Sequence, residues 1–138
     1  MSKVPGRLYS TAGVLFILCG IGHTIGQYGP DAHGAEIAKR IRTFIVPGTT
    51  FNYWNVMQCW GALYGAMTIL FGAGLLAAKR TSGGDPRVIR ALSWIGAVAA
   101  FLQAAVSLGY ATPPPAFFMV PAATLLLLAA RWPEKRAA

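Results

Sequence analysis

His23 is the residue best suited to chemistry, because its imidazole lies inside the first long apolar stretch, in the sequence Gly20-Ile21-Gly22-His23-Thr24. An ionisable side chain inside a segment able to cross a bilayer is expected to face protein, water or a ligand instead of lipid. Cys19 lies one helical turn before His23, and Cys59 lies in the second apolar stretch. Thiolate and imidazole are metal ligands, and imidazole is also a common axial ligand of a tetrapyrrole. Spacing is the only support for either site, so the sequence predicts no metal centre, with Cys19, His23 and Cys59 as the alternative.

Uncharged polar residues gather near the same end of the first three apolar stretches. These candidate ligand-binding residues are His23, Gln27, Asn55, Gln58, Gln103, Ser107 and Tyr110. The simpler interpretation is that His23, Gln58 and Gln103 bond to one another between helices, each contact contributing roughly 0.6 kcal/mol and up to about 2 kcal/mol. The other is a pocket for an apolar molecule such as a lipid, quinone, carotenoid or tetrapyrrole. Both interpretations stay open at this stage.

Several kinds of catalysis lack the residues that they need. The acidic residues Asp31, Glu36, Asp85 and Glu134 all fall in predicted loops or tails, so no carboxylate is available inside a crossing to carry protons or bind a cation. Within the crossings no Ser-His-Asp set, CxxC pair or phosphate-binding glycine loop can be assembled. The sequence therefore leans against an enzyme, with proton transfer by His23 alone as the remaining possibility.

The composition is that of a membrane protein. The chain of 138 residues is 55% hydrophobic and 12% charged, with a mean hydropathy of +0.51, whereas soluble domains have roughly 25% charged residues. The net charge of +8 does not indicate nucleic-acid binding, because the basic residues lie at the ends of apolar runs and form no stripe with stacking aromatics.

Four apolar runs, at about 8–27, 54–78, 88–110 and 116–130, are long enough to be transmembrane helices, since about 20 residues at 1.5 Å each span a hydrocarbon core of roughly 30 Å. They predict an all-α, four-transmembrane-helix bundle as a single domain over residues 1–138. Between the first two runs, Ile37, Ile41, Phe44 and Ile45 share one face, which predicts an amphipathic interfacial helix at about 32–46.

Glycines spaced four apart predict where helices approach closely. Gly22 and Gly26 form one such pair in the first run, and Gly61 and Gly65 form another in the second. Small residues at this spacing let two backbones come together in a membrane, although the pattern is common by chance. Either pair therefore offers a place where another helix can approach closely.

The basic residues predict the orientation. With both termini in the cytoplasm, nine of the lysines and arginines lie inside and only Lys39, Arg40 and Arg42 lie outside. Cytoplasmic loops carry the excess of positive charge in membrane proteins. We therefore expect an N-in, C-in protein of the bacterial inner membrane, with the polar residues in its outer half.

Gly22-His23-Thr24 at the end of the first run, and Tyr53-Trp54-Asn55 followed by Gly61 in the second, resemble a group of small, largely uncharacterised four-helix bacterial membrane proteins. The resemblance covers perhaps half of the chain and implies a fold and a location. It implies no activity.

The expected function is that of a non-catalytic accessory subunit, packed in a larger respiratory or photosynthetic membrane complex with lipid or a hydrophobic cofactor at its helix faces. The glycine-bearing faces, the many aromatics and the missing catalytic set motivate this expectation. The alternative is a small membrane enzyme or carrier that holds a lipid- or quinone-like substrate in an outer-leaflet pocket around His23.

Overall fold

The computed structural model of the chain describes residues 4–28, 36, 39–109 and 114–132. These residues form the helices α1 (Val4–Tyr28), α3 (Tyr53–Thr81), α4 (Pro86–Gly109) and α5 (Pro114–Arg131). All four are long and apolar enough to cross a membrane, as the sequence predicted. Within the described residues there is no strand beyond a single isolated β-bridge.

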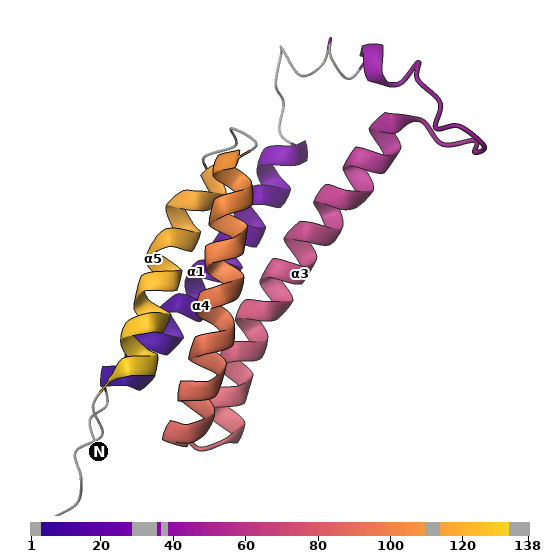
Figure 1. Cartoon of the computed structure of the whole chain (residues 1–138). Helices are drawn as coiled ribbons and strands as arrows, with labels where there is room; N and C mark the ends of the chain where they lie inside the picture. Colours follow the sequence, from indigo (N-terminus) through magenta and orange to yellow (C-terminus); the bar gives the residue numbers. More distant parts are fainter. Residues whose placement is uncertain (1–3, 29–35, 37–38, 110–113, 133–138) are drawn as a thin grey trace, which may run out of the picture.

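The helices are packed in the spatial order α3, α1, α5, α4, which differs from their order in the sequence (Figure 1). α1 lies between α3 and α5, and α4 packs along α5. α3 and α4 follow each other directly, through residues 82–85 with Gly83 and Gly84 at positive φ, yet they touch at few positions. Figure 1 shows α3 close to α4 at the lower end and diverging from the other helices toward the upper end. The bundle is therefore open on one flank.

Glycines allow α1 and α3 to approach closely, and only some of them belong to the pairs with four-residue spacing. A Cβ atom on Gly20 would lie 2.7 Å from the Gly65 carbonyl oxygen, and one on Gly72 would lie 2.5 Å from the Gly13 carbonyl oxygen. Of the two pairs with four-residue spacing, Gly61 and Gly65 lie in this interface. Gly22 and Gly26 lie on the exposed side of α1, with no atom of the described structure near either position.

Small side chains also form the interface between α4 and α5. The buried stripe of α4 includes Ser93, Gly96, Ala97 and Ala100, and a Cβ atom on Gly96 would lie 2.9 Å from Leu126 Cδ1 of α5. α5 contributes further buried alanines to its side of the contact. Membrane helices pack closely where such residues face each other, because lipid provides no hydrophobic drive for association.

The predicted interfacial helix at 32–46 is wrong at its C-terminal end. Residues 39–41 are helical, but the chain then turns, and Ile45 forms an antiparallel β-bridge with Asn52. Backbone bonds from Val46 N to Phe51 O and from Tyr53 N to Phe44 O, with Gly48 at φ 76°, close a compact loop before α3. Residues 32–35 and 37–38 of the prediction lie outside the described residues.

The first turn of α1, the α3–α4 turn and the last turn of α5 lie at one end of the molecule (Figure 1). Lys79 joins two of these elements, because its Nζ atom donates to the Gly6 carbonyl oxygen at 2.7 Å and to Ser10 Oγ at 2.6 Å. Here the ammonium of α3 satisfies polar groups of α1.

Candidate interhelical polar site

At the upper end of the α1–α3 pair, two glutamines bind the helices together. Gln27 Nε2 of α1 donates to the Gln58 carbonyl oxygen at 3.1 Å, to Gln58 Oε1 at 3.3 Å and to the Met57 carbonyl oxygen at 3.3 Å. The Gln27 amide lies where a side chain at Gly61 would be, so the glycine creates the space for this contact. Two of the predicted polar residues, Gln27 and Gln58, therefore meet.

One turn further into the bundle, His23, Tyr64 and Gln103 form a row across three helices. The imidazole of His23 on α1 meets the Tyr64 ring of α3 edge-on, with 4.6 Å between centroids and 64° between planes. The Tyr64 hydroxyl donates to Gln103 Oε1 of α4 at 3.3 Å. We call this set the His23–Tyr64–Gln103 row. It places a polar contact where α3 and α4 otherwise barely touch.

Among the described residues, His23 Nε2 and Gln27 Oε1 are enclosed by the protein without a hydrogen bond of good geometry, and the His23 imidazole lies near the backbone of Gly61 on α3. A buried polar atom without a partner costs roughly 1–3 kcal/mol in protein interiors. Interhelical bonding therefore accounts for Gln58, Gln103 and the amide nitrogen of Gln27, but not for His23 Nε2. The expected direct bonds among His23, Gln58 and Gln103 are absent from the described contacts.

The remaining predicted site residues differ in their surroundings. Asn55 is exposed at the start of α3, and Ser107 belongs to the buried stripe of α4. Tyr110 lies outside the described residues. Cys19 is buried and Cys59 is exposed, and within the described part of the chain no three His, Cys, Asp or Glu side chains are grouped to hold a metal ion. The alternative metal site at Cys19, His23 and Cys59 is not formed.

Tyr64 is the member of the row that the sequence analysis missed. Its spacing in the sequence could have identified it, because it lies one helical turn from Gly61 and one turn from Thr68. Thr68 is buried, and its hydroxyl donates to the Tyr64 carbonyl oxygen at 2.7 Å. A tyrosine flanked by two interface residues at helical spacing is expected near the same interface.

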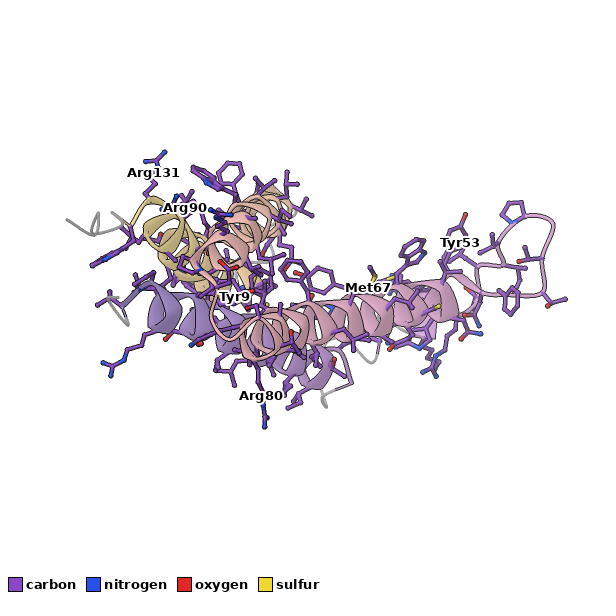
Figure 2. The ribbon with its side chains drawn as sticks, turned by 90° about the horizontal axis from the view of Figure 1, so that it is seen from below. Tyr9, Tyr53, Met67, Arg80, Arg90 and Arg131 are labelled. Atoms are coloured by element: carbon purple, nitrogen blue, oxygen red, sulfur yellow. The ribbon has the colours of Figure 1, made fainter. Side chains whose placement is uncertain are left out.

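The face of α3 that carries Tyr64 is covered at one end only. Trp60, Tyr64, Met67, Phe71 and Leu75 recur at the spacing of one helix face. Leu75 is 4% exposed, and Phe71 packs on Phe16 with 4.9 Å between ring centroids. Trp60 and Met67 are each 69% exposed. We call the upper part of this face, Trp60, Tyr64 and Met67, the open α3 stripe; Figure 2 shows how far this half of α3, with Met67 and Tyr53 labelled, extends from the other helices.

No protein-family model, curated protein or solved structure matches this chain. The residues and their geometry therefore carry the functional proposal.

Proposed function

We propose that this protein is a non-catalytic subunit of a larger membrane assembly, and that a transmembrane segment of a partner protein packs on the open α3 stripe between α3 and α4. The observation that carries the proposal is the change along one helix face. The face is buried against the bundle at Leu75 and exposed at Trp60 and Met67. A partner helix beside the row would complete the flank that α3 and α4 leave open.

The polar row favours protein over lipid as the cover. Tyr64, a member of the open α3 stripe, and Gln103, to which its hydroxyl bonds, are only partly buried. Lipid tails offer no hydrogen bonds, and an unsatisfied polar group in hydrocarbon costs several kcal/mol. Polar residues within crossings therefore face protein or water in most membrane proteins. Trp and Met are also common at protein interfaces, where their large and adaptable side chains fill irregular gaps.

The orientation belongs to the same proposal. Six basic residues of the described chain lie toward the end that holds the α3–α4 turn, and they are Arg7, Lys79, Arg80, Arg87, Arg90 and Arg131. The opposite end has Lys39, Arg40 and Arg42, with the exposed side chains Phe44, Ile45 and Phe51 in the loop before α3. By the positive-inside rule the first end faces the cytoplasm. The loop then lies at the outer surface of a bacterial inner membrane.

Photo-crosslinking in native membranes tests the proposal. A benzophenone amino acid at position 67 of α3 is expected to capture a second, different polypeptide. The same residue at position 117 of α5 is the control, because Phe117 is 74% exposed and lies on a helix that does not contact α3. Capture from neither position, or equal capture from both, would contradict a partner on the open α3 stripe.

A second candidate, a carrier or enzyme for an apolar molecule, is favoured by His23 Nε2 and Gln27 Oε1, to which the described residues give no hydrogen bond of good geometry. A quinone- or lipid-like head could bond to one of them, or a tetrapyrrole metal could bind the imidazole. Because protein atoms enclose both, such a ligand would have to displace neighbouring side chains. Lipid extraction and an absorption spectrum of the purified protein test this function. The carrier or enzyme function requires a bound quinone, pigment or haem that is lost in a His23→Leu variant but kept in a Cys59→Ser variant.

A further inference from the structure

A second charged feature lies on the outer face of the α4–α5 pair, at the end that holds the α3–α4 turn. Arg90 and Trp94 are one turn apart on α4, and Arg131 is the last residue of α5. The Arg131 guanidinium lies over the Trp94 ring, with 5.6 Å from Cζ to the ring centroid. Arg90 Nη2 donates to the Trp132 carbonyl oxygen at 3.5 Å. Arg90, Trp94 and Arg131 form what we call the arginine–tryptophan site.

The packing of the two helices brings the arginines to the same level. α4 and α5 are antiparallel, and Gly96 lies against Leu126. That register sets Arg131 beside the turn of α4 that contains Arg90. In Figure 2 both arginines lie at the same edge of the molecule, whereas Arg80 points away on the opposite side. Two guanidinium groups from different helices thus lie at the same end of the α4–α5 pair.

The site has the chemistry of a phosphate clamp. Each guanidinium presents a planar set of N–H donors that matches phosphate oxygens. The contact of Arg131 with Trp94 limits the freedom of that guanidinium, so less conformational entropy is lost when it binds. Tryptophan is enriched at the level of the lipid headgroups, where its ring is in contact with both acyl chains and water. Both arginines are exposed, so a headgroup can reach them from the membrane.

We infer that the arginine–tryptophan site binds the phosphodiester headgroup of an anionic phospholipid in the leaflet that surrounds this end of the protein. The site is separate from the proposed partner interface, because Trp94 and Gln103 are nine residues apart and so lie on opposite faces of α4. Loss of one function would therefore leave the other in place.

Native mass spectrometry of the detergent-solubilised protein tests the inference. Phosphatidylglycerol and phosphatidylcholine with identical acyl chains are titrated in turn, and we expect about a tenfold preference for the anionic lipid. The double variant Arg90→Gln/Arg131→Gln should lose that preference, and Arg131→Lys should lose part of it because lysine lacks the planar fork. The control Arg7→Gln/Arg80→Gln removes the same charge from the same end and should bind within twofold of the wild type.

Three results would overturn the inference. Equal binding of both lipids by the wild type would show that no headgroup is recognised. An equal loss in the control variant would reduce the effect to overall charge. Displacement of phosphatidylglycerol by millimolar inorganic phosphate would assign the site to a free anion instead of a lipid. Thermal unfolding of every variant, measured alongside, excludes misfolding as the cause of lost binding.

Discussion

Tyr64 joins α3 to two other helices. Its ring contacts His23 of α1, and its hydroxyl bonds to Gln103 of α4. Along the same face, Trp60 and Met67 on either side of Tyr64 are exposed, whereas Leu75 is buried. Tyr64 therefore connects α4 to the part of α3 whose face is otherwise open.

A double-mutant cycle measures that contact. Tyr64→Phe and Gln103→Leu should each lower the free energy of unfolding in detergent, and the double variant should lose less than the sum because the shared bond is lost only once. The expected coupling is about 0.6 kcal/mol and at most about 2 kcal/mol. A coupling of zero would mean that the bond does not form in the folded protein.

Glycines at the α1–α3 interface make a sharper prediction. A methyl group at Gly65 would overlap Thr24 Oγ1, whereas one at Gly74 of the same helix would meet nothing within 4 Å. Gly65→Ala should therefore destabilise the protein by about 1–3 kcal/mol, as overpacking does. Gly74→Ala should be neutral or stabilising by up to about 1 kcal/mol, since alanine is the better helix former. Equal effects on detergent unfolding would refute the close approach at Gly65.

At the scale of elements, the sequence predicts the existence of the helices better than their contacts. Apolar length identifies four crossings, because a bilayer demands continuous helical hydrogen bonding over its whole thickness. Four-residue glycine spacing, in contrast, occurs in the α1–α3 interface at Gly61 and Gly65 but on the exposed side of α1 at Gly22 and Gly26. In α1 the close contacts are at Gly13 and Gly20, two turns apart. Spacing alone does not say which side of a helix meets a neighbour.

The attachment of α1 to α3 at the basic end depends on Lys79. Lys79→Met removes two donations, to the Gly6 carbonyl oxygen and to Ser10 Oγ, and should cost about 1–2 kcal/mol because the site is only half buried. Arg80→Met is the matched control, since it removes the same charge from the neighbouring, exposed position. Unfolding in detergent should distinguish the two variants. Equal stability would contradict a structural role for Lys79.

At the scale of the whole molecule, the all-α architecture was predictable from the sequence, whereas the open flank between α3 and α4 was not. Hydropathy fixes the number of crossings, but the spatial order α3, α1, α5, α4 follows from which small residues face each other. The polar site shows the same limit. Gln27 and Gln58 meet, as their shared depth suggests. Asn55 is exposed because the rotation of α3 about its axis turns it outward. Periodicity does not determine that rotation in a helix whose residues are mostly apolar.

The central claim is that this protein works as part of a heteromeric membrane assembly. Native mass spectrometry of the tagged protein, released from its own membranes in a mild detergent, tests it most directly. We expect the mass of at least one different polypeptide in addition to this chain, with that polypeptide lost when Trp60 and Met67 are both replaced by Arg and retained when Phe117 is replaced by Arg. A free monomer, or an oligomer of this chain alone, would contradict the claim.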